Sequence, residues 1–170
     1  MNITKFLNKV YFAPRLKEIE QYTSHAGELQ QLVLQRLVRT AANTEWGKKH
    51  DYASIRTYED FKKCLPIQTY EEVKPYVTRL RAGEQNLLWP SEIRWFAKSS
   101  GTTNDKSKFL PVSRESLHDT HYKGGRDAVA IYLGQNPESR FFSGKGLILG
   151  GSHAPNPVSY THLRAHETEL

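Results

Sequence analysis

The stretch that decides the fold of this chain is residues 93–112, which read IRWFAKSSGTTNDKSKFLPV. An apolar run, interrupted by Arg94, covers residues 93–97, and a second apolar run covers residues 109–112. Between the runs lie small polar residues and three lysines, at positions 98, 106 and 108. Two short apolar runs around a turn-forming segment predict a strand, a loop and a strand. We therefore expect a hairpin-like loop displayed at the end of a sheet.

The composition of this loop suits the binding of an anion. The loop offers hydroxyl groups, backbone N–H donors and ammonium groups, from Ser99, Ser100, Gly101, Thr102, Thr103, Lys106 and Lys108. Gly101 permits positive φ and lets a ligand approach the backbone closely. Successive N–H groups in such a turn form a concave anion site, and the two lysines can neutralise phosphate charge. The alternative is a solvated hairpin turn, because these small polar residues are also ordinary turn formers.

The best-known phosphate loop does not fit this stretch. A Walker loop requires Gly, four residues and then Gly-Lys-Ser/Thr at the start of a helix. Counted from Gly101, the second glycine falls on Lys106 and the required lysine falls on Ser107. The apolar run that follows contains Pro111 and is not a helix start. A P-loop kinase or GTPase is therefore excluded.

The hairpin resembles the first ATP motif of the acyl-acid amido synthetases, the Gretchen Hagen (auxin-responsive) family, which are distant relatives of acyl-CoA synthetases and luciferase. The residues that carry the resemblance are Phe96 to Thr103, Lys108 and Pro111. The resemblance continues on both sides, in residues 44–47, 58–61, 66–67, 70–71, 124–127, 142–145 and 149–152. It covers about residues 1–157, and the serine-threonine loop with its flanks is the most specific part.

The resemblance implies an ATP-dependent ligase that makes an acyl-adenylate from a carboxylic acid and then an amide with an amine or amino acid. It implies that the loop residues hold the ATP phosphates, with Lys108 aligned with the motif lysine and Lys106 assisting. Mg²⁺ would accompany ATP, and the resemblance does not indicate which residues of this chain would bind it. Catalytic residues are not identified, and no metal-binding residues of the chain itself are expected.

The family members are several times longer than this chain, so the resemblance also implies that an active site is incomplete here. We therefore expect a truncated part of the large domain that is inactive by itself. Two other interpretations remain open. One is a nucleotide-binding or interaction module without catalysis, and the other is an incompletely folded gene fragment with no function of its own.

Composition limits the class of protein. Hydrophobic residues make up 38% of the chain and charged residues 25%, which is typical of a globular domain. We find no apolar run of about 18 residues and no secretory signal, so we predict neither a membrane span nor secretion. The single cysteine, Cys64, excludes an internal disulfide and suits a reducing cytoplasm. The net charge of +6 is scattered, without a basic run, and therefore does not indicate a nucleic-acid partner.

Periodicity and capping signals predict the remaining elements. A short N-terminal helix should end before Pro14, and a longer helix should cover residues 25–42. Capping residues predict helix starts at Thr57 and Thr69, and Pro75 should kink or split the second of these helices. A further helix is expected over residues 114–133 and a buried strand over residues 147–149. The fold class is therefore α/β: N-terminal helices followed by the start of a mixed sheet.

Some residues outside the hairpin are weaker site candidates. They flank glycines or lie at expected strand ends, and they are Arg126, Ser143, Lys145 and His153. The glycine pair 124–125 lies within the expected helix 114–133, which implies close packing or a helix break. The last segment, residues 158–170, has no clear period and resembles a translated sequencing-adapter tail. We therefore expect a partial N-terminal domain over residues 1–157, followed by a non-native tail.

Overall fold

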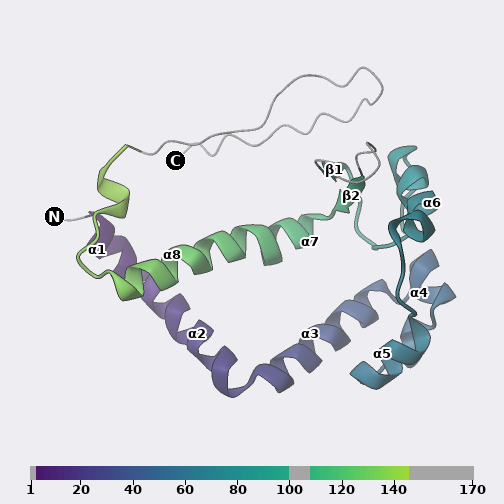
Figure 1. Ribbon diagram of the computed structural model, residues 1–170, viewed down its shortest axis with the longest axis horizontal. Coiled ribbons are helices and arrows are strands. Elements are labelled where there is room, and N and C mark those ends of the chain that lie inside the picture. Colours follow the sequence, from purple (N-terminus) through teal and green to yellow (C-terminus); the bar gives the residue numbers. More distant parts are fainter. Residues whose placement is uncertain (1–2, 100–107, 146–170) are drawn as a thin grey trace. The chain divides into compact units, whose positions relative to one another are not determined.

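The computed structural model describes residues 3–99 and 108–145 (Figure 1). These residues form two compact units. The described part of the first unit consists of residues 3–30 and 115–145, and that of the second consists of residues 31–99 and 108–114. The chain is helix-rich and contains a two-stranded antiparallel sheet, which confirms the α/β class. The predicted strand at 147–149 lies outside the described residues.

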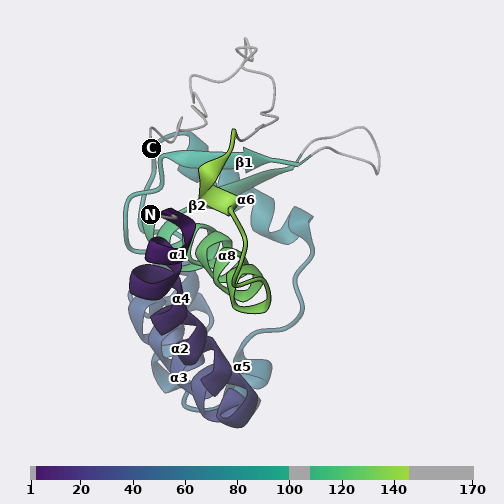
Figure 2. The ribbon, with the colours of Figure 1, turned by 90° about the vertical axis from the view of Figure 1, so that its left-hand side faces the viewer.

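The first unit is built from helices of two segments that lie far apart in the sequence, residues 3–30 and 115–145. Its elements are α1 (Ile3–Leu7), η1 (Asn8–Phe12), α2 (Ala13–Ser24), η3 (Leu117–Tyr122), α8 (Lys123–Gln135) and η4 (Phe141–Ser143). α7 (Arg114–Ser116) leads into η3. Within this unit α2 packs against α8 (Figures 1 and 2). The small core between them is formed by Phe12, Ala130 and Leu133, which are all at least 93% buried.

The helix predicted to end before Pro14 instead continues to Ser24, so this prediction was wrong. Pro14 is the second residue of α2, and proline has no N–H to donate to the preceding turn. The residues before it, Asn8–Phe12, form a wider π-helical turn. Such a turn changes the hydrogen-bond register, so the chain passes the proline without leaving the helical direction.

A buried ion pair joins the two helices of the first unit. The Arg15 side chain is 6% exposed and donates to both carboxylate oxygens of Asp127, at 2.7 and 2.8 Å. The same guanidinium also donates to Glu18 at 2.6 Å and to the Tyr22 hydroxyl at 2.9 Å. A buried charge is tolerated only when its hydrogen bonds are satisfied. Asp127 therefore has a structural role in pairing α8 with α2.

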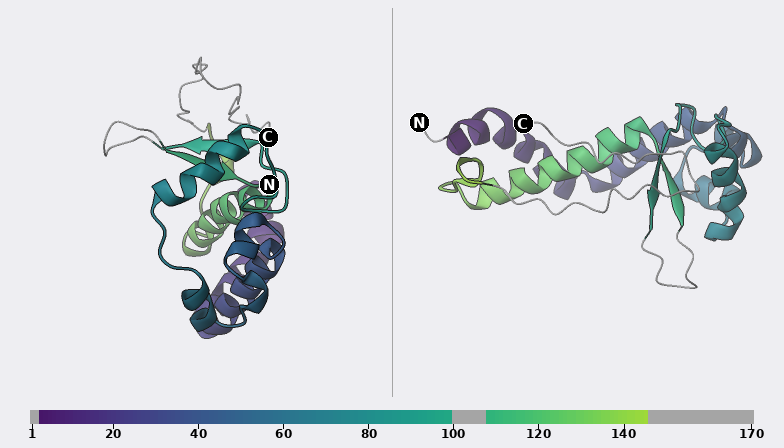
Figure 3. Two further views of the ribbon diagram at one scale, coloured as in Figure 1. Left: turned by 90° about the vertical axis from the view of Figure 1, so that its right-hand side faces the viewer. Right: turned by 90° about the horizontal axis from the view of Figure 1, so that it is seen from above.

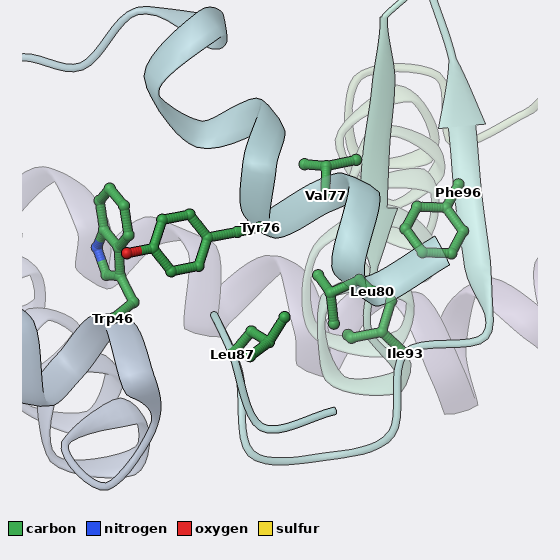
Figure 4. Packing of buried hydrophobic residues seen from close by; sticks show 7 residues of the cluster. All are labelled: Trp46, Tyr76, Val77, Leu80, Leu87, Ile93 and Phe96. Atoms are coloured by element: carbon green, nitrogen blue, oxygen red, sulfur yellow. The ribbon is translucent and has the colours of Figure 1, made fainter. Parts of the chain in front are cut away.

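The second unit contains shorter helices and the hairpin. Its elements are α4 (Glu45–Lys49), η2 (Tyr52–Ser54), α5 (Tyr58–Cys64), α6 (Tyr70–Arg81), β1 (Trp95–Lys98) and β2 (Phe109–Val112). α3 (Ala26–Ala41) begins in the first unit and ends in the second, and it confirms the helix predicted at 25–42. The core consists of Trp46, Tyr76, Val77, Leu80, Leu87, Ile93 and Phe96 (Figure 4). This cluster joins α4, α6 and the hairpin.

The capping signals in the sequence are confirmed. Thr57 and Asp60 form a reciprocal capping box at the start of α5. At the start of α6 the Glu72 carboxylate accepts from the Thr69 N–H at 2.6 Å. At the other end of α6, Gly83 has φ +99°, a conformation that favours glycine, and its N–H donates to the Leu80 carbonyl.

A split at Pro75 and a disturbance at the glycine pair 124–125 were both predicted, and the structure shows neither. α6 is a single helix that runs through Pro75 and is not split there. The predicted helix at 114–133 is confirmed and extends to Gln135, but its glycine pair neither breaks it nor packs closely. A Cβ at Gly124 or Gly125 would meet no described atom within 4 Å. In both cases the surrounding helix keeps enough hydrogen bonds to tolerate the local cost of the residue.

Gly47 is required by a close approach of backbone. The buried Thr44 caps α4, accepting from the Gly47 N–H at 2.9 Å and donating to the Ala41 carbonyl at 2.7 Å. This turn brings Gly47 so near the end of α3 that an added Cβ would lie 2.0 Å from the Ala41 oxygen. Backbone cannot move aside as a side chain can, so only glycine fits here.

Breaking the buried ion pair should destabilise the chain. We expect Asp127→Asn to lower the free energy of unfolding by about 3 kcal/mol, because the buried Arg15 loses its less exposed carboxylate partner and keeps only the more exposed Glu18. The Arg15 hydrogen bonds lower the pKa of Asp127 below its ordinary value. The contribution of the pair should therefore be complete above about pH 4 and disappear as the pH falls through the lowered pKa.

Denaturant unfolding of Asp127→Asn and of the unsubstituted chain between pH 7 and pH 2 measures the difference in their free energies of unfolding. The matched control is Glu138→Gln, which removes an exposed ion pair with Lys5 and should change stability little at any pH. Equal stability of Asp127→Asn and the unsubstituted chain at pH 7 would contradict the structural role of the pair.

Gly47→Ala should destabilise the chain by about 3 kcal/mol, because the new methyl group overlaps the Ala41 carbonyl. Gly124→Ala is the control: it adds the same methyl group in open space within a helix and should stabilise by up to about 1 kcal/mol. Thermal unfolding of the two variants checks the prediction, and equal shifts of the same sign would refute it.

Candidate functional site

The hairpin predicted from the sequence is present. β1 and β2 pair antiparallel, with Trp95 opposite Val112 and Lys98 opposite Phe109. The first strand begins two residues later than predicted, and the second has the predicted bounds. Beyond the ladder the Ser99 N–H donates to the Lys108 carbonyl at 2.9 Å, and the Lys108 N–H donates to the Ser99 hydroxyl oxygen at 3.0 Å. These two bonds close the base of the loop.

The hairpin is held on α6 (Figure 3). Phe96 projects from β1 into the core beside Leu80 and is 3% exposed (Figure 4). The Arg81 guanidinium, at the end of α6, lies 3.9 Å from the centre of the Phe109 ring on β2. The Tyr70 hydroxyl, at the first turn of α6, bonds to both backbone groups of Phe109. Contacts at both ends of α6 therefore set the position of the loop base.

Only part of the predicted phosphate loop can be compared with the structure. Ser99 and Lys108 lie at the loop base, while Ser100, Gly101, Thr102, Thr103 and Lys106 lie outside the described residues. The Ser99 N–H is used within the hairpin, so only its hydroxyl proton is left as a donor for a ligand. Lys98 and Lys108 are both exposed, and their side chains bring positive charge to the loop base. The predicted role of the seven residues stays a prediction.

The weaker candidates lie in the first unit or outside the described residues. The Arg126 guanidinium lies 5.5 Å from the centre of the Tyr11 ring, and its buried Nε has no hydrogen-bond partner among the described residues. The Ser143 hydroxyl is 3.5 Å from that of Thr4, and Lys145 is exposed. His153 lies outside the described residues. Arg126, Ser143 and Lys145 belong to the first unit, whereas the hairpin belongs to the second.

Metal-binding side chains do not cluster among the described residues. No group of three or more His, Cys, Asp or Glu side chains within residues 3–99 and 108–145 could hold a metal ion. His118 and His121, which are three residues apart, both pack against the ring of Tyr122. Within the same part of the chain, no helix is long and apolar enough to cross a membrane.

The sequence did not identify Tyr70 and Arg81 as residues that position the loop. Both lie in the helix whose start was predicted at Thr69, and neither was among the candidate site residues. The Tyr70–Phe109 contact joins residues 39 positions apart, so no local pattern points to it. The one indication in the sequence was the chemistry of the tyrosine side chain, whose ring can pack while its hydroxyl group forms hydrogen bonds.

The architecture agrees with that of a class of ligases. The solved structure of GH3.15 acyl acid amido synthetase matches this chain with a TM-score of 0.63 and 25% sequence identity. The match covers 71% of this chain and 22% of that one. A second structure of this synthetase, in complex with 2,4-DB, matches with a TM-score of 0.62. The fold is therefore similar to that of part of an acyl acid amido synthetase.

Sequence comparisons make the assignment specific. Residues 15–166 match the model of the GH3 family N-terminal domain, and the chain belongs to this family. The indole-3-acetic acid-amido synthetase GH3.5 of Arabidopsis thaliana is 33% identical over 104 residues, which are 61% of this chain and 17% of that protein. The jasmonoyl-L-amino acid synthetase JAR4 of Nicotiana attenuata is 33% identical over 110 residues, 62% of this chain and 18% of that protein.

The chain spans less than a fifth of the length of these curated relatives. The family resemblance inferred from the hairpin and its flanks is confirmed. The family match extends to residue 166 and so overlaps the segment predicted to be a non-native tail, whose structure lies outside the described residues. The boundary near residue 157 stays a prediction.

Removing the buried Phe96 ring should weaken the packing of the hairpin on α6. We expect Phe96→Ala to lower the free energy of unfolding by about 3–4 kcal/mol, because a large ring is lost from the core. Leu110→Ala is the matched control on the facing strand, where the side chain is 50% exposed, and should cost less than about 1 kcal/mol. Denaturant unfolding measures both, and equal losses would show that the hairpin is not anchored through Phe96.

Proposed function

We propose that this chain is the nucleotide-binding part of an acyl-acid amido synthetase, and that the β1–β2 hairpin holds the phosphates of ATP. The observation that carries the proposal is the family match over residues 15–166. The geometry of the hairpin supports it: the loop base is closed by two hydrogen bonds between Ser99 and Lys108, packed on α6 and flanked by the exposed lysines 98 and 108. A rigid base with cations beside it suits electrostatic positioning of a polyphosphate.

The proposed reaction has two steps. In the first, a carboxylate oxygen of the acid attacks the α-phosphorus of ATP, a new P–O bond forms and pyrophosphate leaves. In the second, an amine nitrogen attacks the acyl carbon, AMP leaves and the nitrogen loses a proton. ATP is thus a substrate that activates the acid. The part assigned to this chain is to orient the phosphates and to offset their negative charge through Lys108, with Lys106 assisting.

The acid and the acceptor are proposed as classes. The curated relatives are named for indole-3-acetic acid and for jasmonoyl-amino acid formation, and a solved relative holds 2,4-DB. We therefore propose a small carboxylic acid and an amino acid or other amine, with no nucleic-acid or membrane partner. We place the protein in the cytoplasm because its one cysteine suits a reducing compartment.

Mg²⁺ is proposed to arrive as its complex with ATP. The donor set of the described residues does not fit a dedicated metal site, since they contain no cluster of three metal-binding side chains. The chemistry assigned to this chain is therefore limited to binding and orienting the phosphates. Because the chain spans less than a fifth of its relatives, we further propose that residues 1–170 bind ATP without completing the reaction.

The test uses a protein that carries this chain with the remaining length of its relatives, assayed for ATP–pyrophosphate exchange with a panel of carboxylic acids. Lys108→Ala should reduce exchange about tenfold or more, because a cation beside the transferring phosphates is lost. Lys62→Ala is the matched control, since Lys62 is a similarly exposed lysine that lies over a tyrosine ring in α5. It should leave exchange unchanged.

A non-catalytic nucleotide-binding module is the second candidate, because the loop offers groups that suit an anion while the sequence identifies no catalytic residue. The result that distinguishes it is ATP binding by residues 1–170 without exchange in the longer protein. In that case Gly101→Val should abolish binding without unfolding the chain. Neither binding nor exchange with any acid would remove both proposals.

A further inference from the structure

The second strand of the hairpin has one outward-facing residue whose backbone is capped by a side chain. In an antiparallel ladder alternate residues turn their N–H and C=O groups away from the partner strand. Lys108 bonds back to Ser99, and the next residue, Phe109, turns outward. The Tyr70 hydroxyl accepts from the Phe109 N–H at 3.0 Å and donates to the Phe109 carbonyl at 3.2 Å. One hydroxyl thus satisfies both groups.

The ring of the same tyrosine lies beside the lysine of the loop base. The Lys108 ammonium is 5.4 Å from the centre of the Tyr70 ring, which is within cation–π range. Lys108 is exposed, and a free lysine side chain has several rotatable bonds to immobilise when it binds a ligand. Contact with a half-buried ring limits where the ammonium can lie. Tyr70 therefore contacts both the backbone after Lys108 and the Lys108 side chain.

A second tyrosine in the same unit shows that this arrangement is not an automatic result of helix capping. Tyr58 follows the capping residue Thr57 as Tyr70 follows Thr69, and each is the first residue of its helix. Lys62 lies 5.2 Å from the Tyr58 ring centre, so the cation–π contact is also reproduced. The Tyr58 side chain, however, is exposed, at 59% for the residue. Tyr58 is thus a natural control within the chain.

We propose that Tyr70 is a positioning residue for phosphate binding: through its hydroxyl it fixes the backbone of β2 at Phe109, and through its ring it holds the Lys108 ammonium at the loop base. This inference rests on the proposed function, because it assigns Lys108 to the phosphates. Tyr70 itself does not contact the nucleotide. It reduces the freedom that Lys108 must lose on binding, which improves affinity by preorganisation.

The first test needs no nucleotide. Backbone amide hydrogen exchange, followed by NMR, should show that Tyr70→Phe speeds exchange of the Phe109 amide about tenfold, because its acceptor is lost. Tyr58→Phe should leave that amide unchanged. An unaltered Phe109 amide in Tyr70→Phe would overturn the inference, whatever the chain binds.

The second test is an ATP titration of residues 1–170 and of variants in a double-mutant cycle. Tyr70→Leu removes both contacts and should weaken ATP binding about tenfold, while Tyr70→Phe, which keeps the ring, should weaken it less. In the Lys108→Ala background, Tyr70→Leu should add less than about a twofold loss. A purely structural role would instead give independent losses that multiply. Tyr58→Leu should bind ATP as the unsubstituted chain does.

The outcomes separate the two proposals. If the unsubstituted chain binds ATP and the Tyr70 variants bind it equally well, or if the losses multiply with that of Lys108→Ala, the inference is wrong and the proposed function stands. If the unsubstituted chain and the longer protein bind no ATP, the proposed function is wrong and the role of Lys108 falls with it. Thermal unfolding of each variant identifies losses of affinity that are caused by unfolding.

Discussion

The packing of α6 against the hairpin is the contact on which the second unit depends. A two-stranded hairpin is at best marginally stable alone, so β1 and β2 require a surface to bury against. α6 provides that surface with Val77 and Leu80, and Phe96 packs into the same cluster. The two ends of the helix also reach the hairpin, through Tyr70 and Arg81. The position of the proposed phosphate loop is thus determined by a helix that contributes no residue to the loop.

The contacts of Tyr70 and Arg81 with the hairpin require that α6 start and stop at definite residues. α6 is preceded by Thr69, whose N–H donates to the Glu72 carboxylate, and is followed by Gly83 with positive φ, and both features fix the helix at definite residues. A shift of either end would move Tyr70 or Arg81 away from Phe109. The two aromatic side chains at the first positions of α5 and α6 show the difference: the Tyr58 residue stays exposed, whereas Tyr70 reaches the hairpin.

The first unit is held by a different interaction. Its apolar core is small, and a buried guanidinium supplies an additional connection between α2 and α8. The four hydrogen bonds of Arg15 satisfy most of its donors, which is the condition for a buried charge to be tolerated. The Gly-Gly-Arg-Asp segment was part of the family resemblance, and the structure gives its aspartate a folding role.

The sequence by itself determined the features that depend on near neighbours. Capping boxes, the α3 stripe and the hairpin strands follow from residues a few positions apart, so Thr57, Thr69 and residues 109–112 were predicted correctly. It also identified the family, because the loop motif is local. The helix end at Pro14 and the split at Pro75 were misjudged because hydrogen-bond register and tertiary packing decide whether a helix continues through a proline. Only the tertiary structure decided the partners of Tyr70 and Arg15, which lie 39 and 112 residues away. Such contacts form when folding brings distant segments together, and no periodicity in the sequence records them.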